Sequence, residues 1–205
     1  NKYTDIRADL RGKFTFDDRE LLKVPFVYFL CGFSFKITVG EAENLGDYFL
    51  VGGLLLAEST YAGIELPADT SIRQMMKDAL YAKGIEFGRD WSFEKLPDGH
   101  PIYHCFFDFE SGPPIAGDHW FTPMGSYVAG REPYKYLEGI EIEDRLVAIV
   151  SKKWLGNAWG DWGPGGYPGY GNLNPTRALQ FGVNIIVFAL TQEGSITNRV
   201  MDTVQ

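Results

Sequence analysis

The sequence predicts an α/β fold with a mainly parallel sheet covered by helices on both faces. Two solid apolar runs, at 24–30 and 54–57, carry this prediction, together with the amphipathic segment between them. Strands buried on both faces are continuously apolar, whereas a strand with one wet face alternates. Ligands of such sheets bind beyond the carboxyl ends of the strands, so the polar residues after each run are the first candidates for function.

The residues before the first run are polar and predict only short elements. Brief alternations at 4–7 and 14–16 are typical of edge strands, and residues 17–22 have the composition of one helical turn. The first strong strand therefore begins near Pro25.

Two helices are expected on either side of the second apolar run. Thr38 and Glu41 match a capping box, in which each side chain accepts from the other residue's backbone N–H, so a helix should run from there to about residue 50. Another helix is expected over 72–83, with N-caps at 69–71 and a stop at Gly84.

The second half of the chain combines short strands with a hairpin. Residues 93–96 are expected to form a short strand, and 139–142 and 146–150 alternate around Glu143-Asp144-Arg145 as hairpin strands do.

Two long loops, rich in glycine and aromatic residues, are expected at 111–137 and 156–173. Asn174 is an expected N-cap, and Pro175 in the first turn begins a helix toward Ala189.

Composition excludes some classes of function. The chain has 205 residues, 45% of them hydrophobic, and a formal net charge of −8, so we expect one domain over 1–205. An acidic chain without clustered Lys and Arg is not expected to bind nucleic acid or anionic membranes. No apolar run reaches the roughly 18 residues needed for a transmembrane helix. The chain begins without Met, so we expect that a leader or N-terminal segment is not part of it.

Five segments, in order, resemble the bacterial domain-of-unknown-function family 4159. They are VPFVYFLCG, ENLGDYFLVGGLLLAEST, LPDGHPIYHCFFDF, LEGIEIEDRLVAIVS with KKWLGNAW, and ALQFGVNIIVFALT. Members carry comparable segments, among them PFLYLTGH, DHP.FH..YD, GI..DGRL and GVN.VVYALT. The resemblance implies a three-layer fold like flavodoxin and the class I glutamine amidotransferases. It also implies export or attachment to the cell envelope, sometimes beside MoxR-type ATPases and BatA-type membrane proteins, and it implies no particular reaction.

The chain departs from the family pattern in two places. Members usually begin with another strand and helix ahead of the segment Thr4-Asp5-Ile6, and from the resemblance we expect this opening βα unit to be missing here. One sheet edge is then left uncovered, and an uncovered edge pairs readily with a protein partner or a second copy of the chain. Family members carry two acidic residues after the Gly-Gly strand. This chain has Glu58 and Ser59 there, so only the first position is acidic.

A nucleophile in the amidotransferase fold sits at a strand-to-helix elbow, which corresponds here to Glu58-Ser59-Thr60. This position carries no cysteine, and Cys31 lacks the flanking glycines of an elbow, so a Cys–His–Glu glutaminase is not expected. Ser59 as a serine nucleophile would need a histidine oriented by an acid. We favour the alternative, in which Ser59 is an N-cap or a turn residue.

The cysteines and histidines allow several interpretations. Cys31 and Cys105 are expected to be small buried side chains, with a single bridge between them as the alternative. His100, His104 and Asp108 have spacings that a metal site could use. We favour the interpretation in which His100 bonds the backbone at a turn and His104 packs partly buried, so no metal and no cofactor are expected.

The loop at 156–173 is the strongest candidate for binding. Its tryptophans could stack on a glycan, with Asp161 accepting from a sugar hydroxyl, or they could cover one end of the sheet. The full set of candidate binding residues is Cys31, Glu58, Ser59, Tyr61, His100, His104, Trp159, Asp161 and Trp162.

The function expected from these features is binding and assembly without catalysis, in the bacterial periplasm or on the cell envelope. The partner is a protein or a second copy of the chain, and a glycan is the further candidate. The competing class is a hydrolase that uses Ser59, or a site at His100 and His104, at the strand ends.

Overall fold

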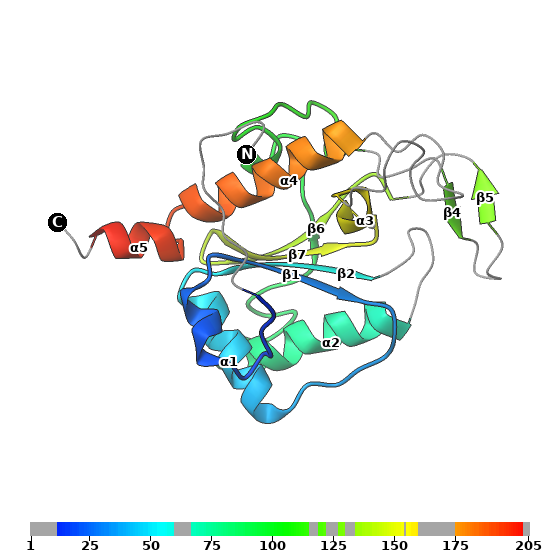
Figure 1. Ribbon diagram of the computed structural model, residues 1–205. Coiled ribbons are helices and arrows are strands. Elements are labelled where there is room, and N and C mark those ends of the chain that lie inside the picture. Colours follow the sequence, from blue (N-terminus) through cyan, green and yellow to red (C-terminus); the bar gives the residue numbers. More distant parts are fainter. Residues whose placement is uncertain are drawn as a thin grey trace.

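The computed structural model describes residues 12–59, 67–114, 119–121, 127–129, 134–153, 155–159 and 175–202. Within these residues a five-stranded sheet lies at the centre of the molecule (Figure 1). Its strands, in spatial order, are β1 (Phe26–Cys31), β2 (Leu54–Ser59), β7 (Arg145–Ser151), β6 (Glu138–Ile142) and β3 (Glu94–Lys95).

The sheet is mixed, which corrects the expectation of a mainly parallel one. β1 pairs with β2 and β2 with β7 in parallel, whereas β6 runs antiparallel to both β7 and β3. The reason is the short turn at Glu143-Asp144, since a two-residue connection can only join antiparallel strands. The expected hairpin is confirmed, but it forms part of the central sheet and is not an addition to it.

Helices cover both faces of this sheet. α1 (Val39–Leu50) and α2 (Pro67–Tyr81) lie on one face, and α4 (Pro175–Thr191) lies on the other (Figure 1). The remaining helices are the 3₁₀ turns η1 (Arg19–Lys23) and η2 (Pro101–Tyr103), the short α3 (Leu155–Trp159), and α5 (Ile196–Asp202), which lies at the C-terminal end of the described chain.

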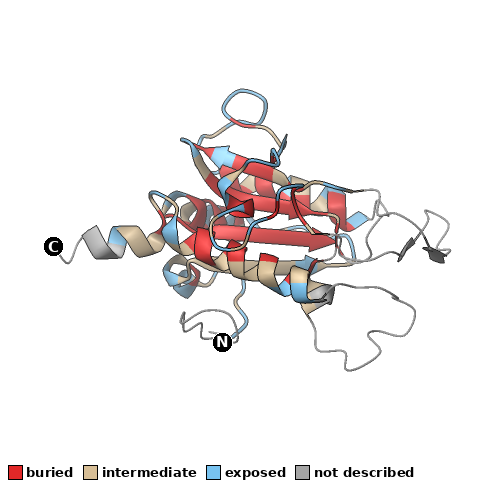
Figure 2. Ribbon diagram, turned by 90° about the horizontal axis from the view of Figure 1, so that it is seen from above, coloured by how far each residue is buried: buried red, intermediate tan, exposed pale blue. Residues whose placement is uncertain are grey.

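The alternation of side chains along β2 divides the apolar interior into two cores. Leu55 and Ala57 pack with α1 and α2, whereas Leu54 and Leu56 pack with α4. All four residues are fully buried, and the strands are the most buried part of the molecule in Figure 2. This explains the continuous apolar run in the sequence, because both faces of the strand are covered.

Local sequence signals explain where several elements begin. The capping box is confirmed, since Thr38 Oγ1 accepts from the Glu41 N–H and Glu41 Oε2 accepts from the Thr38 N–H. The helical turn expected over 17–22 is η1, which Asp18 caps. Gly84 follows the second helix with a φ of +76°, as expected for a residue that ends a helix.

Other elements differ from the expectations. α2 begins at Pro67, a favoured first-turn residue, so the expected caps at 69–71 lie inside the helix. No strand forms at 14–16, and β2 extends through Glu58 and Ser59. The expected loops contain β4 (His119–Phe121), its antiparallel partner β5 (Tyr127–Ala129), and α3. The expectations for 4–7 and Asn174 fall outside the described residues.

No helix in the described part of the chain is both long and apolar enough to cross a membrane.

The β6–β7 turn generates a prediction about stability. Glu143 and Asp144 have φ values of +50° and +61°, a region in which side chains with a Cβ are strained. Asp144→Gly should relieve this strain and stabilise the protein by about 0.5 kcal/mol or more. Urea unfolding should show a higher midpoint with an unchanged slope.

The matched control is Asp17→Gly, an exposed turn residue that is not among the positive-φ residues of the described chain. This change should lower stability slightly, because glycine gains freedom in the unfolded state. Equal effects of the two substitutions would contradict the argument.

Candidate functional site

Glu58 and Ser59, the last two residues of β2, point to opposite faces of the sheet. Successive side chains of a strand alternate in direction, and Leu56 packs with α4 while Ala57 packs with α1 and α2. Glu58 therefore lies on the α4 face, and Ser59 lies on the face covered by α1 and α2. The two polar residues that the sequence places side by side belong to different environments.

The Glu58 carboxylate is fully buried and accepts four hydrogen bonds. Oε1 accepts from the Ser151 hydroxyl at 2.6 Å and from the Leu155 N–H at 2.8 Å. Oε2 accepts from the Gly156 N–H at 2.9 Å and from the Tyr28 hydroxyl at 3.0 Å. A carboxylate has about four acceptor positions, so the chain itself fills all of them.

Burial and hydrogen bonding act in opposite directions on Glu58. Burial raises the pKa of this carboxyl above its ordinary value, and the four donors work against that rise because they favour the charged form. Burial, reinforced by the neighbouring carboxylate, also raises the pKa of Tyr28, so the phenol keeps its proton and remains a donor. These five residues, Glu58 with Tyr28, Ser151, Leu155 and Gly156, form what we call the Glu58 cluster.

The cluster leaves no room for an extra atom at Gly156. A Cβ at this position would lie 1.9 Å from the Tyr28 hydroxyl oxygen. Trp159 closes the other side: its ring packs 5.4 Å from that of Tyr28, and its indole N–H donates to the Ala178 carbonyl of α4 at 2.9 Å. Trp159 thus packs between β1 and α4, on the α4 face of the sheet.

Lys153 lies two residues after β7 and is also buried. Its backbone N–H donates to the Ser151 hydroxyl at 3.1 Å, and its ammonium donates to the Tyr134 carbonyl at 2.8 Å. Sequence reasoning missed Tyr28, Ser151 and Lys153. Two features of the sequence could have pointed to these residues. Ser151 comes directly after the apolar run 146–150, and Tyr28 places a polar hydroxyl within the apolar run 24–30.

Ser59 and Cys31 lie on the other face of the sheet, at the ends of neighbouring strands and in register with each other. Ser59 is 1% exposed, and its hydroxyl has no hydrogen-bond partner in the described structure. It is a strand residue, so the expectation that it is an N-cap or turn residue is wrong. The predicted strand ended at Ala57, because the apolar run ends there, whereas β2 continues through Ser59.

Cys31 and Cys105 are both free thiols on opposite sides of the sheet, since Cys105 packs against the core that contains α4. The alternative of a bridge between them is therefore wrong, and so is the expectation of full burial, since both side chains are half-buried. Burial raises the pKa of Cys105 to about 11, so its thiol stays protonated at neutral pH.

His100 has the role expected for it. Its Nδ1 accepts from the Ile102 N–H at 3.1 Å, which caps the short turn η2, and its Nε2 lies 3.6 Å from Glu141 of β6. Burial lowers the pKa of His100, against the influence of Glu141. The hydrogen bonds of this imidazole are therefore used to hold a turn.

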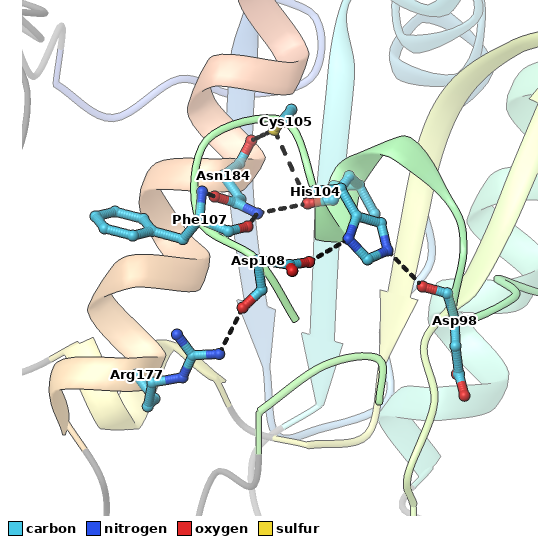
Figure 3. A network of polar contacts seen from close by, with 8 residues as sticks. Asp98, His104, Cys105, Phe107, Asp108, Arg177 and Asn184 are labelled. Carbon is cyan, nitrogen blue, oxygen red and sulfur yellow. Dashed lines mark hydrogen bonds and ion pairs between the residues drawn. The ribbon is translucent and has the colours of Figure 1, made fainter. Parts of the chain in front are cut away.

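His104 is exposed, which corrects the expectation that it is partly buried. Its Nδ1 lies 2.5 Å from Asp108 Oδ1 and its Nε2 lies 2.9 Å from the Asp98 carbonyl oxygen (Figure 3). The Asp98 carbonyl and Asp108 raise the pKa of His104. The ring joins two points of its own loop.

Asn184 of α4 fastens the segment around His104 to the helix (Figure 3). Its buried amide accepts from the Phe107 N–H at 2.8 Å and donates to the carbonyls of Ile102 and Phe107 at 3.0 and 2.8 Å. Arg177 of the same helix donates to the Asp108 carbonyl at 2.8 Å. Sequence reasoning did not single out Asn184, although it lies in one of the five segments on which the resemblance was based.

The candidate residues therefore do not converge on one site. Neither His100 nor His104 bonds Ser59, and no group of three or more His, Cys, Asp or Glu side chains that could hold a metal occurs in the part of the chain that the structure describes. Tyr61, Asp161 and Trp162 lie outside the described residues.

Comparison with known proteins gives one match. The family model described as domain of unknown function (DUF4159) matches residues 1–190, which covers every element described above except α5 and the end of α4. No curated protein matches the chain.

The Glu58 cluster generates a prediction about stability. Glu58→Gln replaces one acceptor oxygen with an NH₂ donor, and either orientation of the amide places this donor against a fixed backbone N–H. We expect a loss of about 2–3 kcal/mol in the free energy of unfolding, measured by urea denaturation.

Tyr28→Phe is the matched control, because it removes one of the four hydrogen bonds and leaves the carboxylate in place. It should cost about 1 kcal/mol. Equal losses for the two variants would show that the carboxylate is not the centre of the cluster.

Asn184 generates a second prediction. Asn184→Asp places a buried carboxylate against two carbonyl oxygens, so the protein should lose about 3 kcal/mol or more in the free energy of unfolding. Asn198→Asp is the control, since this partly exposed amide of α5 also donates to two carbonyls, those of Thr191 and Gln192. Thermal and urea unfolding of both variants should show a small loss for the control; a similarly small loss at Asn184 would contradict its role as the fastening point.

Proposed function

We propose, for a chain that belongs to the family described as domain of unknown function (DUF4159), a function in binding and assembly without catalysis. The scaffold we infer is a three-layer, amidotransferase-like one, and its helix-covered parallel strands β1, β2 and β7 support that inference. Its partner is a protein, with a second copy of the chain as the simplest case.

The observation that carries this proposal is the saturation of Glu58. In an α/β enzyme the polar groups at the strand ends are held ready for a substrate. Here the carboxylate at the end of β2 already accepts from Ser151, Tyr28 and two backbone N–H groups. A group with every acceptor position filled by its own chain is a structural connection, and it is not free to move a proton.

The competing hydrolase hypothesis has less support. A serine nucleophile requires a histidine within hydrogen-bond reach. Ser59 points toward α1 and α2, whereas His100 contacts Tyr103 and Phe188 in the core on the α4 face. The alternation of β2 thus separates the proposed nucleophile from this base by the thickness of the sheet.

The surface that fits the proposed binding function is the outer edge of β1. This strand ends the spatial order of the sheet and has one strand partner, β2, in the described structure. Leu30 near its end is 42% exposed, and Phe33 in the following loop is 83% exposed. An edge strand beside exposed apolar side chains favours pairing with another strand.

The setting we propose is the bacterial periplasm or cell envelope, on the strength of the family resemblance. A glycan is the second candidate ligand and would involve the loop at 156–173. Because Trp159 is engaged by Tyr28 and α4, that role would fall to Asp161 and Trp162, which lie outside the described residues.

The proposal is tested by measuring self-association of the purified chain by sedimentation velocity. The wild-type chain should form dimers at micromolar concentration, and Leu30→Lys should shift it to monomers, because the charge repels the incoming strand. Phe87→Lys is the control, since Phe87 is 47% exposed and packs on Phe93 beside β3, at the opposite edge of the sheet; it should leave the dimer intact. A wild-type chain that stays monomeric, or equal effects of both substitutions, would refute pairing through β1.

A further inference from the structure

The loop at 98–108 is closed by a histidine whose two ring nitrogens both face oxygen acceptors. His104 Nδ1 lies against the Asp108 carboxylate and Nε2 against the Asp98 carbonyl (Figure 3). A neutral imidazole carries one N–H, so it can donate to only one of these oxygens. The imidazolium carries two and satisfies both.

Residues 102–108 of this loop are fastened to α4, and the Cys105 thiol also donates to the Asn184 carbonyl, at 3.3 Å. Asn184 holds Ile102 and Phe107, and Arg177 holds the carbonyl of Asp108. Between these anchors the chain is exposed at His104 and at Phe106, whose side chain is 48% exposed. The His104 contacts therefore restrain the outer part of the loop, where Phe106 is presented to the surroundings.

We propose that His104, Asp108 and the Asp98 carbonyl form a proton-dependent clasp, which holds the outer part of the 98–108 loop when His104 is charged and releases it when the proton is lost. Loss of the proton turns one of the two hydrogen bonds into a contact between two acceptors. The device is regulatory, and it does not depend on the binding function proposed above.

The charges around the ring favour the closed state. The carboxylates of Asp108 and Glu110 act on His104 from its own segment, and the cation that α4 contributes, Arg177, bonds the Asp108 carbonyl and stacks on the Phe109 ring. The surrounding carboxylates and the carbonyl raise the pKa of His104 above its ordinary value of about 6.5. The clasp is therefore fully closed below pH 6.5 and opens as the pH rises through the raised value.

The experiment is an NMR titration of the full chain between pH 5.5 and 9, combined with hydrogen exchange of the amides from His104 to Asp108. His104→Gln serves as the reference because glutamine does not titrate. The wild-type chain should show about two- to fivefold slower exchange than His104→Gln at low pH, and the ratio should fall to one as His104 loses its proton. Taking the ratio at each pH removes the intrinsic pH dependence of exchange.

Two isosteric variants form a matched pair. Asp108→Asn removes the carboxylate that contacts Nδ1, and it should lower the His104 titration midpoint by about 0.5 unit or more. Asp98→Asn keeps the carbonyl that accepts from Nε2, so it should lower the midpoint less. An exchange ratio that does not change with pH, a His104 midpoint at or below 6.5, or equal shifts in the two variants would overturn the proposal.

Discussion

The fold depends on a fully buried carboxyl group, that of Glu58, at the end of β2. A carboxylate without partners in the interior would be too costly to keep, so Glu58 is tolerated only because four donors surround it. These donors come from β1, β7 and the first residues of α3, and they join the three parallel strands to the connection that leads into α4. The position of Trp159 follows from this arrangement, because Gly156 must fit beneath Tyr28 before the indole can reach α4.

A second constraint joins parts of the chain about 80 residues apart. Asn184 uses both its amide oxygen and its amide nitrogen on the backbone of the segment that contains His104. The segments DGHPIYHCFFDF and GVNIIVFALT are two of those on which the family resemblance was based, and the structure shows that one binds the other. A shared segment of this kind is then explained by packing and needs no substrate.

The sequence predicted elements whose signals are local and missed relations that depend on tertiary structure. The capping box at Thr38 and the hairpin around Glu143 each depend on a few adjacent residues, and both are confirmed. The mixed character of the sheet could not be predicted, because a hairpin pattern does not say which strand it will join. The end of β2 was misplaced for a related reason: a strand buried on both faces has no alternation that continues into Glu58 and Ser59.

The alternation of side chains along β2 also bears on function. Adjacent polar residues at a strand end suggest a site only if their side chains meet, and on an extended strand adjacent side chains diverge. On one face of the sheet, the Glu58 carboxyl oxygens accept hydrogen bonds from four donors of the same chain. On the other face, Ser59 is buried, and its hydroxyl has no hydrogen-bond partner in the described structure. Catalysis needs polar groups that remain available to a substrate, whereas recognition of a strand needs only backbone groups and apolar contact. The proposed recognition of a strand rests on the second kind of feature, the exposed Leu30 and Phe33 beside the edge strand β1.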